Sequence, residues 1–279
     1  MNVLDAQISI VILNYLNYQD TINCVESIFA CGFKLCGIVV VDNGSKNESY
    51  EVLNKRYAEN SNVYLLSAKK NLGFAKGNNI GIKFAREKLH SEFVFCCNND
   101  IIFNDTDYFV KLLNHYSLNV GIIGSAIVNA NNVLQPEFVL NIGFKALVTS
   151  YLNCYGYLNG ANFELPTDEF KYQRIIHGCA LLFTPAFFYY YKGFYKRTFL
   201  YYEEPILFFM CKEKGLIQVY VEDTSIKHLE DKSSEMSFLN DIEVMRKYSF
   251  KSMKYLVYWS FRDLIWCSLK KNKKGCKVK

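Results

Sequence analysis

Short apolar runs alternate with amphipathic stretches over residues 8–98, and this alternation constrains the fold more than any other feature. The apolar runs are Ile8 to Leu13, Gly37 to Val41, about Asn62 to Leu66, and Phe93 to Cys97. The stretches between them, 21–30, 50–58 and from 71 onward, carry helical patterns. Strands separated by helices predict an α/β fold with a doubly wound parallel sheet.

The last of these runs, FVFCCNNDIIF, ends abruptly in polar groups. Phe93 to Cys97 has the composition of a strand covered on both faces, and Asn98, Asn99 and Asp100 follow it. In open α/β sheets ligands bind outside the carboxyl ends of strands, so Asp100 is a candidate metal ligand. The alternative is a simple turn in which Asn and Asp side chains bond their own backbone.

Two further turns follow the same logic. Asp42 and Ser45 flank Gly44 at the end of the second run, where glycine permits close backbone approach to a base or ribose. Gly73 and Gly77 space a loop rich in Asn with Lys76 between them. The chain has neither GxGxxG nor a Walker loop at these places. Taken singly, a turn of this kind is more often structural than functional.

Taken together, VILNY, VVVDNGS, NLGFAKGNNIG and CNNDIIF strongly resemble the family 2 glycosyltransferases of the GT-A fold, in the branch that includes bacterial rhamnosyltransferases. The resemblance covers roughly residues 9–228. It implies a Rossmann-like, mostly parallel sheet flanked by helices, followed by a C-terminal helical extension. It also implies a nucleotide-diphosphate sugar donor, with a dTDP or UDP carrier, and Mn²⁺ or Mg²⁺ as cofactor.

The resemblance also assigns residues to this donor site. Asn14 and Asp42 would contact the base, Asn98 would lie near the ribose, and Asp100 would hold the cation. The full set of implied nucleotide-sugar residues is Asn14, Tyr15, Asp42, Asn43, Ser45, Asn71, Gly73, Phe74, Lys76, Asn78, Asn98 and Asn99. The usual metal motif of the family is acidic at both ends, whereas this chain has Asn98 at the first position.

The second half is less regular. Residues 105–116 indicate a helix and 120–128 a strand, but 129–171 show no clear period and predict a functional loop or lid that shapes the acceptor site. A strand follows at 180–184, and Pro185 begins a short helix. A further strand is predicted at 216–221.

Glu203 and Glu204 directly precede the apolar helix PILFFMCKEKG, which Gly215 ends. We expect both carboxylates to point at a strand end and away from the core. As an alternative, they cap the helix and complement its dipole. The resemblance implies instead that Glu204 is the general base and Glu203 its partner, and that His228 contacts the metal or diphosphate.

Composition and charge limit the partners and the cellular location that the sequence allows. The net charge of +5 gathers in the KKNKKGCKVK ending, so a nucleic-acid-binding face is not indicated. We expect no secretory leader and no membrane span, ten reduced cysteines, and a cytoplasmic protein, peripheral on the inner face of the plasma membrane. Residues 238–269 indicate a helix, either packed on the domain with a solvated basic tail or lying at an anionic lipid surface.

The sequence therefore predicts a glycosyltransferase domain over 1–230, with its donor half at 1–104 and its acceptor half at 105–230, and a basic, membrane-proximal extension at 231–279. The predicted activity is metal-dependent, inverting transfer of a hexosyl or rhamnosyl group to a hydroxyl of a glycan or lipid-linked glycan, in bacterial surface polysaccharide synthesis. A catalytically inactive nucleotide-sugar-binding subunit is the alternative. A dinucleotide-dependent oxidoreductase is disfavoured, because GxGxxG is missing after the first strand.

Overall fold

The computed structural model describes residues 6–136, 138–159, 171–229 and 242–275. The first half contains β1 (Ile8–Asn14), α1 (Tyr18–Ala30), β2 (Gly37–Asp42), α2 (Ser49–Tyr57), β3 (Val63–Ser67), α3 (Phe74–Glu87), β4 (Phe93–Asn98) and β5 (Ile101–Ile102). The second half contains α4 (Tyr108–Asn114), β6 (Val120–Val128), β7 (Val139–Asn141), α5 (Phe144–Leu158), β8 (Tyr172–Arg174), β9 (Ala180–Phe183), α6 (Pro185–Tyr190), α7 (Glu203–Glu213), β10 (Ile217–His228) and α9 (Ile242–Gly275).

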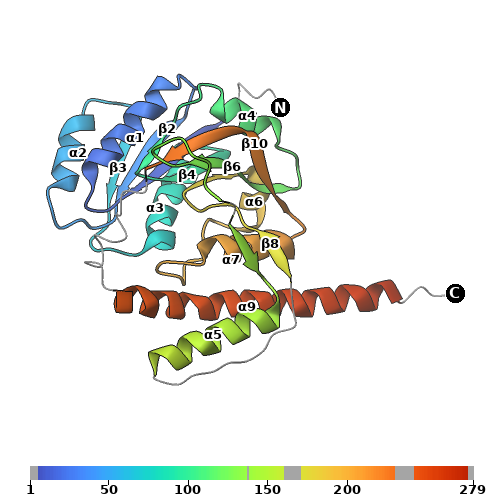
Figure 1. The fold of residues 1–279 in the computed structure, drawn as a ribbon. Coiled ribbons are helices and arrows are strands. Elements are labelled where there is room, and N and C mark those ends of the chain that lie inside the picture. Colours follow the sequence, from blue (N-terminus) through green and yellow to red (C-terminus); the bar gives the residue numbers. More distant parts are fainter. Residues whose placement is uncertain (1–5, 137, 160–170, 230–241, 276–279) are drawn as a thin grey trace.

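A sheet of eight strands in the order β3-β2-β1-β4-β9-β6-β10-β5 organises the molecule (Figure 1). Strands β1 to β4 are parallel to one another, as the alternating sequence predicts. In this register Asn14 lies opposite Asp42, and Leu13 lies opposite Asn98. The polar strand ends predicted from sequence therefore meet at one edge of the sheet.

Helices cover the sheet on both faces. Ile10 and Ile12 of β1 pack with α1 and α2, and also with α4, whereas Val11 packs on the opposite face with α3. The helices α6, α7 and α9 complete this second face. Because both faces are buried, the strands read as continuous apolar runs in the sequence.

The sheet is mostly parallel, as the resemblance implies, and strand β9 is an exception that runs antiparallel to both β4 and β6. One feature of the second half differs from the sequence prediction. The region predicted as a loop or lid contains the helix α5, whose Tyr151 ring stacks on Phe250 of α9 at 4.7 Å. The apolar side chains of α5 pack on a helix almost 100 residues later in the chain. The local sequence pattern therefore did not indicate that this segment is a helix. The region also contains β7, and its residues 137 and 160–170 lie outside the described residues.

The long helix α9 runs along one side of the domain beside α5, and its C-terminal part projects beyond the domain (Figure 1). It buries Leu256 and Trp259, and its Asp263 accepts a hydrogen bond from Lys212 of α7 at 2.5 Å. The helix is thus packed on the domain, as one of the two sequence alternatives requires.

The side chains of the basic tail, residues 270–279, and the predicted helix start at 238–241 lie outside what the structure describes. No helix among the described residues has the length and apolar character needed to cross a membrane.

Candidate functional site

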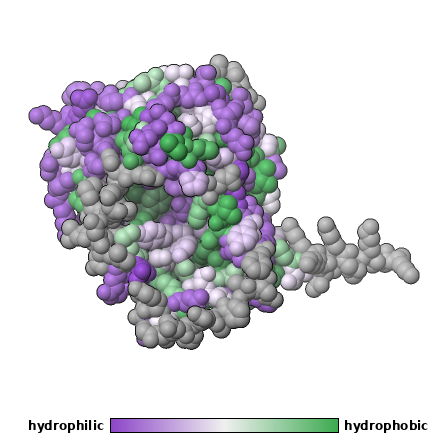
Figure 2. Space-filling view, viewed as in Figure 1, coloured by the Kyte–Doolittle hydropathy of each residue, from purple (hydrophilic) through white to green (hydrophobic). Residues whose placement is uncertain are grey.

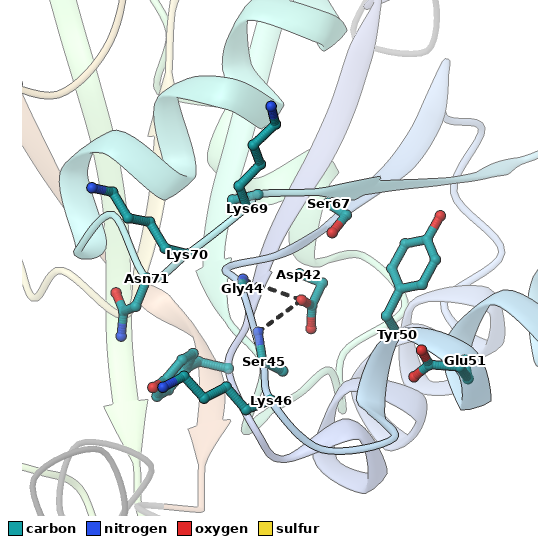
Figure 3. Close-up of a pocket in the computed structure, with 12 residues that line it drawn as sticks. Asp42, Gly44, Ser45, Lys46, Tyr50, Glu51, Ser67, Lys69, Lys70 and Asn71 are labelled. Carbon is teal, nitrogen blue, oxygen red and sulfur yellow. Dashed lines mark hydrogen bonds between the residues drawn. The ribbon is translucent and has the colours of Figure 1, made fainter.

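Asp42, the last residue of β2, is fixed by donors on both of its oxygens. Asn14 Nδ2 donates to Oδ2 at 2.8 Å, and the N–H groups of Gly44 and Ser45 donate to Oδ1 at 3.1 and 3.0 Å (Figure 3). Gly44 has a φ of +77°, and a Cβ there would lie 2.3 Å from the carbonyl carbon of Lys70. The turn therefore needs glycine and holds a buried carboxylate in one orientation.

A pocket of about 490 Å³ opens at this turn. Among the residues that line it are the predicted Tyr15, Asp42, Ser45 and Asn71. Figure 3 shows Asp42 near its middle, with Tyr50 and Glu51 on one side and Lys46 and Asn71 on the other. Its size and mixed polar lining are those of a small-molecule site. The space-filling view of the molecule shows a hollow on the face of Figure 1, with hydrophobic side chains inside it and hydrophilic ones above (Figure 2).

The loop before α3 is tied to this turn. Asn43 Nδ2 donates to Asn71 Oδ1 at 3.1 Å, and the same oxygen accepts from the Gly73 N–H at 2.8 Å. Gly73 has a φ of +83°, and a Cβ there would lie 2.3 Å from the Phe199 carbonyl oxygen. That oxygen accepts from the Phe74 N–H at 2.7 Å. The loop thus joins the pocket to a segment 125 residues later.

Three other predicted nucleotide residues have different surroundings. Asn78 is buried and donates to the Phe74 carbonyl at 3.1 Å, while its Oδ1 has no hydrogen-bond partner among the described residues. Lys76 is exposed. Asn99 donates to the Asn17 carbonyl at 2.9 Å and to Thr21 Oγ1 at 3.2 Å, so its amide supports the start of α1 and does not face the pocket.

Asp100 and His228 come together although they are far apart in sequence. Antiparallel pairing of β5 with the end of β10 places His228 Nε2 at 3.3 Å from Asp100 Oδ1 and at 3.5 Å from Asn98 Nδ2. Asp100 is buried, and neither its Oδ1 nor His228 Nδ1 has a hydrogen-bond partner in the part of the chain described. His228 Nε2 thus lies beside Asp100 Oδ1, while Nδ1, on the other side of the imidazole ring, is the nitrogen without a partner among the described residues.

These two groups fit a partial metal shell. Hard divalent cations accept a carboxylate together with water and substrate phosphate oxygens, so a protein need not supply every ligand. Within the described residues, no group of three or more His, Cys, Asp or Glu could hold a metal ion. Asp100 and His228 would therefore share a cation with a bound ligand.

Helix α7 begins at Glu203, two residues earlier than the sequence predicted. Glu203 is buried, contrary to our expectation that both carboxylates point away from the core, and its Oε1 has no partner among the described residues. Burial, and secondarily the nearby Glu204 carboxylate, raise the pKa of Glu203 to about 8. Burial also raises the pKa of Glu204. At neutral pH the pair therefore carries less charge than two exposed carboxylates.

Glu204 lies against the backbone of Gly178. A Cβ at Gly178 would be 2.3 Å from Glu204 Oε1, so a larger residue there would displace this carboxylate. Gly178 lies two residues before the antiparallel strand β9. The strand-end placement expected from sequence therefore holds for Glu204.

His177 is a site residue that the sequence analysis did not single out. Its ring lies 5.8 Å from the His228 ring, and its Nδ1 accepts from the Cys179 N–H at 3.3 Å. The only local signal is the His-Gly pair before an apolar strand. His177, His228 and Asp100 are thus near one another, and Glu204 lies against the backbone of Gly178, the residue after His177.

Comparison with known proteins decides the family. Residues 9–199 match the model described as Glycosyl transferase family 2, which is more than half of the chain. The chain belongs to glycosyl transferase family 2. The matched region of this family 2 protein includes the Asp42 turn, Asp100 and His177, but it ends before Glu203.

One relative and two solved structures are informative. The low-salt glycan biosynthesis hexosyltransferase Agl10 of Haloferax volcanii is 28% identical over 130 residues, which are 47% of this chain and only 39% of that relative. The mannosyltransferase PcManGT from Pyrobaculum calidifontis, in complex with GDP-Man and Mn²⁺, has a TM-score of 0.57 at 11% identity, covering 98% of this chain and 81% of that one. TarS 1–349 of S. aureus, in complex with UDP, has a TM-score of 0.51 at 16% identity, covering 81% and 61%. These likenesses establish the GT-A fold.

Proposed function

We propose that this family 2 protein is an inverting glycosyltransferase. It would move a hexosyl group, rhamnosyl included, from a nucleotide-diphosphate sugar to a hydroxyl of a glycan or lipid-linked glycan during surface-glycan synthesis. The observation that carries the proposal is the pairing of Asp100 with His228 beside the polar strand ends, with His177 next to His228 and Glu204 against the backbone of the adjacent Gly178. The neighbours named for hexosyl and mannosyl transfer, and those bound to GDP-Man or UDP, support a nucleotide-sugar donor.

The donor would lie across three strand ends. The pocket at Asp42 would bind the nucleoside of the donor. Donors that carry uridine, thymidine or guanosine are the ones to compare. The ends of β2 and β4 are separated by two strand spacings, with β1 between them, which is about 10 Å. A diphosphate attached to a nucleoside in the pocket could therefore reach Asp100 and His228.

Asp100 and His228 would hold Mn²⁺ or Mg²⁺ in this arrangement. When bound, such a cation supplies positive charge that stabilises the leaving diphosphate. His228 keeps its place through the pairing of β10 with β5. Asn98, the departure from the usual acidic pattern, would contribute an amide beside the imidazole and no second carboxylate.

Glu204 would act as the general base. Its carboxylate would take the proton of the acceptor hydroxyl while the hydroxyl oxygen bonds to the anomeric carbon and the diphosphate leaves from the opposite face. A raised pKa makes the carboxylate a stronger base, and a positioned base typically contributes about 10² to 10⁴ in rate. Glu203, protonated at neutral pH, would keep a second negative charge away from Glu204.

Donor turnover tests the proposal. The purified protein is assayed against a panel of nucleotide sugars with Mn²⁺, Mg²⁺ or EDTA, beside Asp100→Ala and Glu204→Gln. We expect metal-dependent hydrolysis of one donor, its loss in Asp100→Ala, and loss of transfer with retained nucleotide binding in Glu204→Gln. Nucleotide binding without turnover under every condition would favour the inactive nucleotide-sugar-binding subunit instead.

We also propose that α9 meets an anionic lipid surface at the inner face of the plasma membrane. The exposed face of α9 carries Lys247, Lys251 and Lys254, and then Tyr258, Phe261, Ile265 and Leu269, at intervals of three or four residues. These side chains therefore share one stripe of the helix. Lysines beside exposed aromatic and aliphatic groups fit an interface that is both negatively charged and apolar. Such a contact would bring the domain to a lipid-linked acceptor.

A further inference from the structure

Two successive tyrosines have left-handed backbone conformations directly before the carboxylate pair. Tyr201 has a φ of +74° and Tyr202 a φ of +66°. For bulky side chains this conformation is strained and persists only where the surroundings enforce it. The turn also sets the first residue of α7, because the Tyr202 carbonyl accepts from the Ile206 N–H at 3.2 Å. The conformation of the turn therefore determines where α7 begins, and with it the positions of Glu203 and Glu204.

Helix α9 supplies the contacts that hold this turn. Ser252 Oγ donates to the Leu200 carbonyl at 2.8 Å, and Ser249 Oγ donates to Tyr202 Oη at 3.1 Å. The Tyr248 ring stacks on Phe199 with centroids 4.5 Å apart. Ser252 is buried, so water does not compete for its hydrogen bond to the Leu200 carbonyl. The three side chains lie on one side of α9, within about one helical turn.

The other end of the same segment contacts the donor side. The Phe199 carbonyl accepts from the Phe74 N–H at 2.7 Å, at the start of α3, and leaves no space for a Cβ on Gly73. Phe199 to Tyr202 therefore connects the loop at the nucleotide pocket to the carboxylate pair. Helix α9 contacts this connection at three of its four residues.

We propose that Ser249 and Ser252 are positioning residues, through which α9 fixes the strained turn and thereby places Glu204 beside Gly178. Neither residue touches the site itself. Both lie outside residues 9–199, which match the family model. The effect of these serines on catalysis rests on the proposed function. Their effect on the conformation of the turn does not. The C-terminal helix is then part of the active-site support and not only a packing element.

The test uses the full-length chain with Ser249→Ala and Ser252→Ala, and Ser268→Ala as the matched control. Ser268 lies on the same helix, but its hydroxyl donates to the Leu264 carbonyl of α9 itself at 2.9 Å. We measure amide hydrogen exchange over residues 199–204, with 93–98 as an internal reference. On the active donor we measure kcat for transfer and the donor KM.

We expect exchange over 199–204 to rise about tenfold in both variants, because the turn opens locally. We expect kcat to fall by about 10- to 100-fold, because a displacement of about 1 Å can cost 10²-fold, while the donor KM changes by less than about threefold. Ser249→Thr, which keeps the hydroxyl, should restore both values. Tyr202→Phe removes the same bond from its other side, so adding Ser249→Ala to it should have little further effect.

Two results would overturn the inference. One is exchange over 199–204 that stays at the level of Ser268→Ala in both variants. The other is a lower melting temperature with unchanged kcat, which indicates packing alone. If the wild type turns over no donor, the proposed function fails, and the exchange measurement still decides whether α9 holds the turn. If the wild type is active and the variants match it, only the positioning role is lost.

Discussion

The carboxylates of this chain differ most clearly in their partners. Asp42 has donors on both oxygens from its own chain, so its position and charge are fixed by the fold. Asp100 is also buried, yet its Oδ1 has no hydrogen bond among the described residues. Its polar neighbour there is His228 Nε2 at 3.3 Å, and a buried carboxylate oxygen without a hydrogen bond is costly unless a ligand or ion completes it. This contrast supports the proposal that Asp100 contacts a bound ion, whereas the fold alone accounts for the position of Asp42.

Asp100→Asn should abolish stabilisation of the protein by Mn²⁺. The substitution keeps the side-chain shape but removes the charge that pairs with a cation. In the wild type, Mn²⁺ with UDP or GDP should raise the melting temperature, by about 2 to 4 °C for each kcal/mol of binding linkage. Differential scanning fluorimetry with Mn²⁺ and then EDTA measures this. Asp107→Asn, an exposed position, is the control and should keep the shift. A full Mn²⁺ shift in Asp100→Asn would remove Asp100 from the site.

Glu203 should make the protein less stable as the pH rises. Its pKa is about 8 in the folded protein and about 4.5 when exposed in the unfolded chain, so the folded state binds more protons between these values. Stability from this group is complete below about pH 4.5 and is lost as the pH rises through 8. The total is a few kcal/mol at most, at about 1.4 kcal/mol per pKa unit.

Glu203→Gln should therefore flatten the decline in unfolding free energy between pH 5.5 and 9. Urea unfolding at a series of pH values measures the slope. Glu59→Gln, at an exposed position, should leave the wild-type slope unchanged. An equally steep decline in Glu203→Gln would show that another group causes it.

At the scale of elements, the sequence was most informative where the chain pairs with near neighbours. The strands β1 to β4 and their polar ends were predictable, because each strand is buried on both faces and each helix shows its own period. The antiparallel direction of β9 and the existence of α5 were not, since both depend on partners distant in sequence. Distance in sequence also explains which residues of the candidate site could be predicted. Asp42 and Asp100 follow recognisable strands, whereas the roles of His177 and Ser252 depend on distant contacts.

Gly73→Ala should be far more damaging than Gly32→Ala, although both glycines have positive φ. Gly32, with a φ of +66°, has nothing within 4 Å of the position that a Cβ would take, so alanine there adds only backbone strain, about 1 to 2 kcal/mol. At Gly73 the Cβ would meet the Phe199 carbonyl oxygen at 2.3 Å. We expect an additional loss of about 1 to 3 kcal/mol and weaker nucleotide binding.

Urea unfolding and isothermal titration with UDP or GDP measure the two effects. Gly32→Ala serves as the matched control for the shared backbone strain. Equal losses of stability for the two variants would mean that the loop moves freely away from Phe199. That result would also weaken the connection between the pocket and the turn before α7.

At the scale of the whole molecule, α9 has two unlike sides. One side buries Leu256 and Trp259 against the domain and contacts the turn before Glu203. The other side carries the stripe of lysines followed by Tyr258, Phe261, Ile265 and Leu269. A surface bound by the second side would lie within one helix diameter, about 10 Å, of the first. Membrane contact and support of the carboxylate pair would then be functions of the same helix.

Replacing Phe261 and Ile265 together with glutamate should abolish binding to anionic vesicles. Each side chain is less than half exposed, so its burial in a lipid interface contributes about 1 kcal/mol, and the new charges are repelled by the lipid. Binding should therefore fall at least about tenfold. Co-sedimentation with vesicles of equal phosphatidylglycerol and phosphatidylcholine measures it, and high salt should weaken wild-type binding. Leu118→Glu, at an apolar position that is 87% exposed outside α9, is the control and should bind as the wild type does. Equal binding by the double variant, or a dimer in light scattering that only the double variant disrupts, would assign the stripe to something other than lipid.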